Sequence, residues 1–385
     1  MAKVLLGDVV DHVKDKVDKD STDLEFYVGG EHIDGDEITV RRRGHIEGST
    51  IGPAFHTRFQ QGDVLLMSRN PHLRKASMVD FDGICSDVSY VCRTKDNNVL
   101  LQSLLPFILQ TPEFWQFAEE NKKGGLPFFL NWKDFARFEF ELIPIDRQQQ
   151  ISNLLWAMER TKNAYRELIA KTDELVKSQF IEMFGDPERN PLGWPVMRLD
   201  SIVTNSNNGI TRRGNDPDGS IVLRIVELQD GFIDYSNVNR MDIKDKEQKC
   251  RLVDGDLLFV RVNGNPDYVA RSAVFSDIGE PVYHNDHIIR MHVDETKAYV
   301  RFIREFTTTD YAKKQLKDHV KTSAGQYSIS QDGIGSIQLV LPPLDKQGQF
   351  ISFLEQSDKS KFEAQQTLKE LTDAQKALMK KIFEQ

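Results

Sequence analysis

The segment LIPIDRQQQI (residues 142–151) recurs as LPPLDKQGQF (residues 341–350), and each copy leads into more than thirty residues without proline or glycine. Four positions match at a shift of 199 residues: Pro144, Asp146, Gln148 and Gln150 lie opposite Pro343, Asp345, Gln347 and Gln349. A proline before such a stretch marks the start of a helix, and Asp146 and Asp345 are the expected caps. The repeated segment therefore predicts two equivalent long helices.

Apolar residues in both stretches follow the alternating three- and four-residue spacing of a coiled-coil seam. In the first helix they are Ile151, Leu154, Met158, Tyr165, Leu168 and Leu175, with Thr161 and Thr172 as polar gaps. In the second they are Phe350, Leu354, Ala364, Leu368, Leu371, Leu378 and Ile382. At 1.5 Å per residue each helix could reach roughly 50 Å. Because each helix follows an equivalent region, we expect the two helices to pair antiparallel.

The similarity extends upstream of the helices. LGDVV at residues 6–10 resembles LDSIV at 199–203, and QQGDVLLMSRN at 60–70 resembles VDGDLLFVRVNGN at 253–265, both at a shift of 193. ICSD (84–87) and FFLNWKDF (128–135) match YHND (283–286) and YSISQDGI (327–334) at a shift of 199. Colinear matches at nearly constant offset indicate an internal duplication.

These patterns predict an α+β chain with a pseudo-two-fold internal repeat. Two mixed α/β regions, 1–143 and 186–341, would be separated by an antiparallel two-helix coiled coil made of 144–185 and 342–385. Stretches such as GDVLLMS, GDLLFVRV and HIIRMHVD alternate like strands, and helical patches are expected at 99–121 and 297–320. The Gly-Asp before each apolar run indicates a turn in which the aspartate caps free amides. GDPERNPLGWP at 185–195 is expected to form a rigid elbow after the first helix.

The charge balance leaves nucleic-acid binding open. The chain carries 50 lysines and arginines against 59 aspartates and glutamates, a net charge of −9, whereas DNA-binding domains are usually basic. The basic residues are clustered, however, in RRRGH (41–45), RNPHLRK (69–75) and KDHVK (317–321). A local cluster can attract an anionic partner despite an acidic total.

Composition predicts a cytoplasmic protein of two or three domains that does not engage a membrane. No apolar run approaches the roughly 18 residues needed to span a bilayer. The first residues, MAKVLLGDVVDHVKDK, contain no secretory pattern. Cys85, Cys92 and Cys250 form no CxxC pair and no even disulfide set, which fits a reducing compartment.

Catalytic and metal-binding motifs are absent from the sequence. There is no G-x-x-x-x-G-K-[ST] loop for a triphosphate, no glycine-rich cofactor fingerprint and no Asn-Pro-Pro-aromatic tetrapeptide of the amino-methyltransferases. His284, His287 and His292 with Asp286 are the nearest approach to a set of metal ligands. Strand spacing places some of them on opposite faces, and the first copy lacks the histidines. We therefore expect no metal site and no catalytic residue.

Several of these segments resemble the specificity subunits of type I restriction-modification systems. They are FGDPERNPLGWPVMRLDSI (184–202), PPLDKQGQFISFLEQ (342–356), GDLLFVRVNG, SAGQYSIS, and in the first half YVGGEHID, GDVLLMSRNP, FDGICSD and FFLNWKDFARFEFELIPI. The resemblance covers essentially the whole chain. Two departures are LIPIDRQQQI, which lacks the second proline, and the expectation that the chain starts directly in the first recognition domain, without a leading helix.

The resemblance implies that each mixed region is a target-recognition domain that reads one half-site of an asymmetric, interrupted double-stranded DNA target. The paired helices would set the gap and dock two methyltransferase subunits, which use S-adenosylmethionine to methylate adenine. A motor-nuclease restriction subunit would join in the restriction form. The chain itself would bind no cofactor. Independently of the resemblance, two DNA-binding domains on a spacer of this length suit half-sites that are one turn of DNA apart, about 34–36 Å from centre to centre.

Candidate DNA-reading residues follow from side-chain chemistry. Arginine pairs bidentately with guanine, asparagine and glutamine with adenine, and lysine holds phosphates. The candidates in the first domain are Arg41, Arg42, Arg43, Arg69, Asn70, His72, Arg74 and Lys75. Those in the second are Arg212, Arg213, Arg261, Asn263, Asn265, Lys321, Gln326 and Tyr327. Lys122, Lys123 and Lys133 are further candidates, whereas Trp132 is expected in the core.

Two other functions remain open at the level of sequence. A standalone metal-dependent nuclease could use a diffuse set of Asp, Glu and Lys residues. A coiled-coil adaptor would bind proteins through its globular ends.

Overall fold

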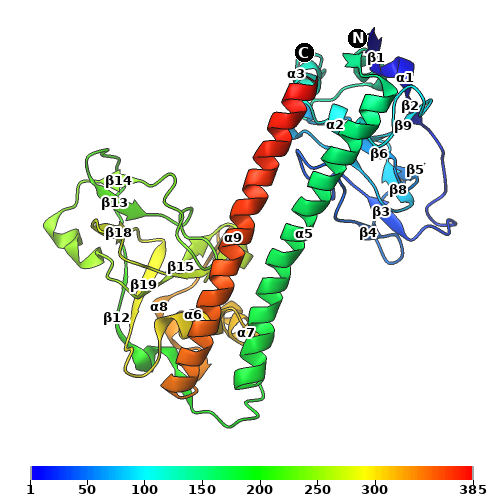
Figure 1. Cartoon of the computed structure of the whole chain (residues 1–385). Helices are drawn as coiled ribbons and strands as arrows, with labels where there is room; N and C mark the ends of the chain where they lie inside the picture. The colour runs from blue at the N-terminus through cyan, green and yellow to red at the C-terminus, as the bar shows by residue number, and fades with distance from the viewer. Residues whose placement is uncertain (1, 384–385) are drawn as a thin grey trace. The chain divides into compact units, whose positions relative to one another are not determined.

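Two strand-rich regions, each followed by a forty-residue helix, make up the computed structural model, which describes residues 2–383 (Figure 1). The chain divides into two units, Met1–Glu167 with Ala364–Gln385 and Leu168–Glu363. We call them unit 1 and unit 2. Each contains one mixed α/β region together with parts of both long helices, α5 (Ile145–Phe184) and α9 (Leu344–Phe383).

The mixed region of unit 1 is built around a four-stranded antiparallel sheet of order β2-β9-β6-β7. A second sheet, β4-β3-β8-β5, contains one parallel pair, β3 with β8. The strands are β1 (Ala2–Leu5), β2 (Val10–Val13), β3 (Phe26–Val28), β4 (Gly44–His45), β5 (Phe55–Phe59), β6 (Val64–Met67), β7 (Ala76–Met78), β8 (Gly83–Ser86), β9 (Ser89–Thr94) and β10 (Glu139–Leu142). The short helices are α1 (Leu6–Val9), the 3-10 turn η1 (Pro71–Leu73), α2 (Leu105–Ile108), α3 (Pro112–Glu120) and α4 (Trp132–Phe135).

Unit 2 repeats the main sheet and the parallel pair of this topology and adds a three-stranded sheet of order β16-β21-β20. Its four-stranded antiparallel sheet has the order β12-β19-β15-β17, and its parallel pair is β13 with β18. The strands are β11 (Val196–Arg198), β12 (Val203–Asn208), β13 (Ser220–Leu223), β14 (Arg240–Met241), β15 (Asp256–Val260), β16 (Val262–Asn263), β17 (Ser272–Val274), β18 (Val282–His284), β19 (Ile288–Val293), β20 (Lys321–Ser323), β21 (Gln326–Ser328) and β22 (Gln338–Val340). The helices are η2 (Leu199–Ile202), η3 (Asp245–Cys250), η4 (Pro266–Tyr268), α6 (Val300–Thr307), α7 (Asp310–Asp318) and α8 (Gln331–Gly335).

The predicted duplication is thus visible as a repeated order of strands. In each region the first strand pairs antiparallel with the last, β1 with β10 and β11 with β22, immediately before the long helix. The two predicted helical patches each split into two helices, and the second begins at a threonine whose hydroxyl accepts an N–H three residues on: Thr111 from Phe114, and Thr309 from Ala312.

The Gly-Asp turns form as expected and do more than cap. Asp63 accepts the backbone N–H of Gln60 and also holds the Arg93 guanidinium at 2.7 Å, although its side chain is only 2 % exposed. Asp256 accepts the N–H of Val253 and faces His292 at 3.0 Å. Each aspartate therefore joins a turn to a neighbouring strand through a buried charge, in addition to capping the turn.

Each long helix begins two residues earlier than the capping prediction required. Because α5 starts at Ile145 and α9 at Leu344, Asp146 and Asp345 lie in the first turn and are not caps. There a carboxylate still interacts favourably with the positive end of the helix dipole. The capping prediction was wrong.

The contact face of α5 also differs from the predicted seam. Leu154, Leu168 and Leu175 are 51 %, 46 % and 52 % exposed. The buried positions of this helix in unit 1 are Gln148, Ile151, Ser152, Leu155, Glu159 and Lys162. The apolar pattern predicted a contact face made of leucines. The face of α5 that is buried includes polar and charged side chains that hydrogen-bond to one another. On α9 the predicted Phe350, Leu354 and Ala364 are buried.

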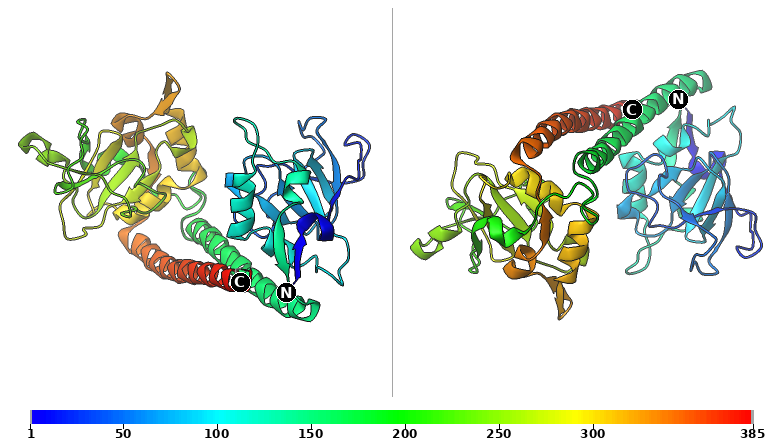
Figure 2. Two further views of the ribbon diagram at one scale, coloured as in Figure 1. Left: turned by 90° about the horizontal axis from the view of Figure 1, so that it is seen from above. Right: turned by 90° about the horizontal axis from the view of Figure 1, so that it is seen from below.

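The two long helices touch within each unit. In unit 1, Lys162 Nζ donates to Gln375 Oε1 at 2.7 Å, and in unit 2, Lys361 Nζ lies 2.6 Å from Asp173 Oδ1. The mixed region of unit 1 lies against the first half of α5, where Trp156 Nε1 donates to the carbonyl of Ser103 (Figure 2). In unit 2, Phe180 and Phe184 of α5 pack with Phe302 and Phe350.

None of the helices in the described part of the chain combines the length and apolarity needed to cross a membrane. The three cysteines are free and buried.

Candidate nucleic-acid interface

A three-stranded hairpin sheet in unit 2 gathers five of the predicted DNA-reading residues. Strand β16 pairs with β21, which pairs with β20, so that Asn263 lies opposite Tyr327. The N–H of Ile329 donates to the carbonyl of Arg261 at 3.0 Å. Arg261, Asn263, Lys321, Gln326 and Tyr327 therefore lie in or directly beside one small sheet, although they are far apart in the chain.

A polar groove of about 410 Å³ opens beside this hairpin. Arg261 and Lys321 line it together with Asn208 and Gln331. The Gln331 amide donates to Asn208 Oδ1 at 3.1 Å, and its oxygen accepts from Ser206 at 2.7 Å. Asn208 and Gln331 are not among the DNA-reading residues predicted from the sequence. Gln331 lies within the matched segment YSISQDGI, and its amide is of the kind that reads adenine.

The corresponding part of unit 1 also contains a hairpin. Lys123 and Phe129 exchange two backbone hydrogen bonds, and Phe129 bridges to Arg69. The N–H of Asn70 donates to the carbonyl of Phe128 at 2.8 Å. This places residues 123–129 beside Arg69 and Asn70, as β20 and β21 lie beside Val262 and Asn263 in unit 2. Leu126, at the hairpin tip, is 85 % exposed.

The lysines of this hairpin are already engaged. Lys122 pairs with Glu119 at 2.7 Å and its ammonium lies 4.5 Å from the Phe128 ring. Lys123 pairs with Asp134 at 2.7 Å, which lowers the pKa of that carboxyl. Lys133 is exposed, and Trp132 is partly buried against the core as expected.

His72 and Arg74 lie in the loop that follows Asn70, between β6 and β7, and both are exposed. Arg74 is 3.5 Å from Asp36. Lys75 donates to the carbonyl of Gly30 at 2.5 Å, so its ammonium holds the loop. In unit 2, Asn265 lies in the equivalent loop, and its side-chain oxygen accepts the N–H of Asp267.

The arginine cluster 41–43 is held within its own domain. Arg41 pairs with Glu37 at 3.2 Å, and Arg42 with Asp34 at 2.5 Å. The Arg43 guanidinium lies 3.9 Å from the Phe26 ring and also over Phe81. The three arginines therefore have intramolecular partners. None of these contacts brings them next to Arg69 and Asn70.

Arg212 and Arg213 are likewise paired. Arg212 binds both oxygens of Glu247, at 3.1 and 2.9 Å, and this pair lowers the pKa of Glu247 to about 2. Arg213 lies 2.8 Å from Asp286 but is 58 % exposed, so it can still exchange its partner for a phosphate.

The three histidines considered as metal ligands have separate roles. His284 is fully buried between Asn207 and the carbonyl of Ile288, and burial lowers its pKa to about 4. His292 faces Asp256, and His287 faces Arg213. Among residues 2–383, no group of three His, Cys, Asp or Glu side chains has the geometry to hold a metal ion.

Comparison with known proteins relates this architecture to restriction systems. The sequence model of the family described as the type I restriction modification DNA specificity domain matches residues 191–373. The type I restriction enzyme StySPI specificity subunit of Salmonella potsdam is 29 % identical over 167 residues, which are 43 % of this chain and 36 % of that protein. The EcoKI specificity subunit of Escherichia coli (strain K12) is 26 % identical over 256 residues, 61 % of this chain and 55 % of that one. The matches thus span about a third to a half of these relatives.

Two solved structures share the fold. The S subunit of a type I restriction-modification system from M. genitalium has a TM-score of 0.59 at 14 % identity, with 99 % of this chain and 96 % of that chain covered. A chain from a structure described as the basis of complex assembly and conformational transition of the type I R-M system has a TM-score of 0.53 at 18 % identity, with the same coverage. Residues 191–373 thus match the type I restriction modification DNA specificity domain, and the fold of the whole chain is similar to that of the two solved structures.

Proposed function

We propose that this chain is the DNA sequence-specificity subunit of a type I restriction-modification complex and has no catalysis of its own. The observation that carries the proposal is the duplicated domain: two regions whose four-stranded sheets have the same strand order each present a hairpin beside the strand that follows a Gly-Asp turn. A protein with two such heads is suited to a bipartite double-stranded DNA target. Because the hairpin residues differ between the copies, the two half-sites differ.

The proposed readers divide into base-reading and backbone-binding groups. In unit 2, Asn263, Gln326 and Gln331 offer amides to adenine, while Arg261 offers a guanidinium to guanine or phosphate. In unit 1, Arg69 and Asn70 take the same roles. Lys321 would contact phosphate and set the register of the protein on the duplex.

We further propose that α5 and α9 form an antiparallel two-helix coiled coil that sets the gap between half-sites. The support is the order of contacts: Lys162 of α5 meets Gln375 late in α9, whereas Asp173 of α5 meets Lys361 earlier in α9. The domain boundaries proposed for this arrangement are 1–143, 144–185, 186–341 and 342–385.

The exposed leucines of α5 are the proposed docking line for two methyltransferase subunits. Leu154, Leu168 and Leu175 recur at multiples of seven residues, so they lie on one helix face and are about half exposed. A restriction subunit would join the same complex. S-adenosylmethionine would be bound by the methyltransferase subunits, and the complex would act in the cytoplasm, where buried free thiols such as those of this chain persist.

Genome-wide mapping of methylated adenines tests this proposal. The chain is co-expressed with its methyltransferase partner in a host that lacks other methyltransferases, and the partner alone is the control. We expect methylation at one bipartite motif with a constant gap. Methylation without sequence preference would contradict the proposal, as would cleavage of DNA by the purified chain with divalent metal. Removal of one or two heptads from both helices is expected to change the gap or abolish assembly.

A further inference from the structure

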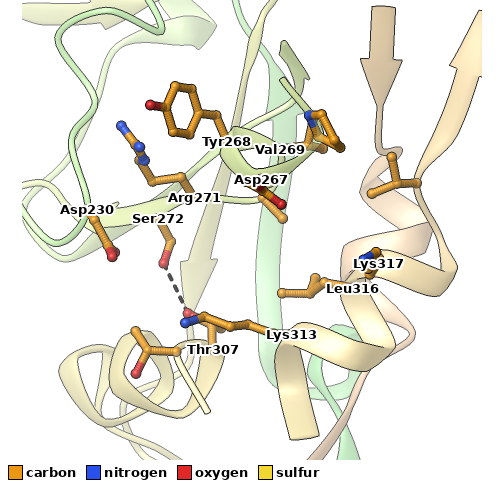
Figure 3. A pocket seen from close by; sticks show the side chains of 14 residues that line it. Asp230, Asp267, Tyr268, Val269, Arg271, Ser272, Thr307, Lys313, Leu316 and Lys317 are labelled. Atoms are coloured by element: carbon orange, nitrogen blue, oxygen red, sulfur yellow. Dashed lines mark hydrogen bonds between the residues drawn. The ribbon is translucent and has the colours of Figure 1, made fainter. Parts of the chain in front are cut away.

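A second cavity, of about 360 Å³, lies in unit 2 between helix α7 and the loop that joins η4 to β17 (Figure 3). Lys313, Leu316 and Lys317 of α7 form one wall. Asp267 of η4 and Val269 and Arg271 of the loop belong to the opposite wall. The volume lies within the range of small-ligand pockets, about 300–1,000 Å³.

The internal repeat shows what fills the same place in unit 1. Helices α3 and α7 have nine residues each and begin after equivalent threonine caps, Thr111 and Thr309. Four residues after each cap stand Trp115 and Lys313. One residue before each cap stand Gln110 and Thr308.

In unit 1 these positions are closed by a planar ring and an amide. Trp115 is 1 % exposed, and its indole N–H donates to Gln110 Oε1 at 3.0 Å. The Gln110 amide in turn donates to the carbonyl of Ala76 at 2.7 Å, at the start of β7. In unit 2, Ser272 starts the equivalent strand, and its hydroxyl lies 3.0 Å from that of Thr307. Thr308 donates to the carbonyl of Glu305, and Lys313 is exposed. The second copy therefore has a cavity where the first copy has the indole ring of Trp115.

The chemistry of the lining defines what can enter. Leu316, Val269 and Val320 supply an apolar floor for a planar ring. Lys313 and Lys317 are one turn apart on α7 and both exposed, so their ammonium groups can converge on one anionic group. Asp267 supplies an acceptor for a ring N–H, while the other carboxylate of the lining, Asp230, is bound to Arg304 at 2.6 Å.

We propose that this cavity binds a nucleotide, with the base in the place that Trp115 occupies in the first domain and the phosphate between Lys313 and Lys317. The nucleotide is either free or an unpaired nucleotide of a DNA strand. The cavity adjoins the candidate interface in the chain, because Asn265 precedes its loop and Lys321 follows its helix. Only the DNA-strand source rests on the proposed function.

Binding of nucleoside monophosphates to the full chain, without methyltransferase subunits, tests the site. The probes are AMP, dTMP and dCMP, compared with the nucleosides and with deoxyribose 5-phosphate, by calorimetry and saturation-transfer NMR. We expect at least one monophosphate to bind with Kd below about 1 mM and its nucleoside or sugar phosphate about tenfold more weakly. No binding up to about 10 mM by any monophosphate would overturn the proposal.

A double variant that rebuilds the closed arrangement of unit 1 locates the binding. T308Q/K313W should reduce nucleotide affinity at least about tenfold, whereas K314W, one residue along the same helix and outside the lining, should leave it unchanged. K317Q removes charge without adding volume and should weaken the monophosphate but not the nucleoside. Circular dichroism checks that the variants fold. Binding that persists unchanged in both T308Q/K313W and K317Q would place the nucleotide elsewhere and refute the site.

Competition distinguishes the two sources. A duplex with one unpaired extrahelical nucleotide displaces the bound monophosphate if the ligand belongs to a DNA strand, and a fully paired duplex does not. If neither duplex competes, the ligand is a free nucleotide; both results support a nucleotide site. Failure of the proposed function would appear instead as loss of the bipartite methylation pattern, which these binding measurements do not use.

Discussion

At the scale of single residues, two buried glutamines explain why the helix starts are repeated in the sequence. Gln148 Nε2 donates to the carbonyls of Val99 and Ile143, and its oxygen accepts the N–H of Leu101. Gln347 repeats this, donating to the carbonyl of Pro342 and accepting from Tyr299. Both side chains are 0 % exposed, so each joins the helix to its own domain where water cannot replace the bonds.

Replacement of Gln148 by leucine is therefore expected to destabilise the protein. The substitution leaves a buried N–H and two carbonyls without their partner, which costs about 3 kcal/mol. Urea unfolding measures the loss. Q149L, on the exposed side of the same turn, should change the free energy of unfolding by less than about 0.5 kcal/mol. Equal effects of Q148L and Q149L would show that burial of the amide is not the cause.

His284 predicts a pH dependence. Burial lowers its pKa to about 4 from the usual histidine value of 6.5, so the unfolded chain takes up a proton first as the pH falls. The stability contributed by the neutral ring is thus present above pH 6.5 and lost progressively toward pH 4, by on the order of 3 kcal/mol. H284Q should flatten the fall of unfolding free energy over this range, whereas H72Q, on an exposed loop, should not. An unchanged slope in H284Q would contradict the assignment.

At the scale of elements, a buried charge network fixes how α5 meets α9 in unit 1. Lys162 Nζ lies 2.9 Å from Glu159 and 2.7 Å from Gln375 of the other helix. The side chains of Lys162 and Glu159 are 4 % and 1 % exposed. Arg166 links Glu159 to Glu37 of the mixed region. Such a network selects one register, because any shift along the helices would leave a buried charge unpaired.

The single and double substitutions in this network should differ in how far they destabilise the protein. K162M leaves the Glu159 carboxylate with only Arg166 and Gln375 and is expected to cost about 3 kcal/mol. E159M/K162M removes both charges and should recover most of that loss. Chemical denaturation of the three proteins provides the comparison. A double variant as unstable as K162M would mean that packing and not charge pairing dominates.

The two hairpins predict separable specificity. R69A/N70A in unit 1 should relax one half of the methylated motif, and N263A/Q326A in unit 2 the other half. Loss of one bidentate contact costs about 1–3 kcal/mol of discrimination between bases. Methylation mapping of each variant with the methyltransferase partner shows which positions become degenerate. R42A, in an intramolecular ion pair, is the matched control and should preserve both halves.

At the scale of the whole molecule, substitution of the exposed leucines of α5 should affect assembly with partners but not folding of the chain. L168S/L175S removes apolar surface that is already about half exposed, so the isolated chain should keep its stability. The affinity for the methyltransferase subunit should fall at least about tenfold, because desolvation of such side chains drives helix docking. Co-purification and calorimetry measure it. E174S/K177S, on other faces of the same helix, should bind as the parent does.

The sequence alone revealed the duplication, the two long helices and the turns, because repeated residues and apolar periodicity can be recognised from the order of residues along the chain. Tertiary structure decided which candidate residues lie together. Arg41 and Arg212 looked as suitable as Arg69 from residue type, yet their ion-pair partners are known only once Glu37 and Glu247 are placed. The same holds for the seam of α5: heptad spacing identified Leu154, Leu168 and Leu175, whereas the folded chain buries Glu159 and Lys162. Periodicity ranks side chains by their own hydrophobicity, and only the fold shows which polar groups find partners that make burial favourable.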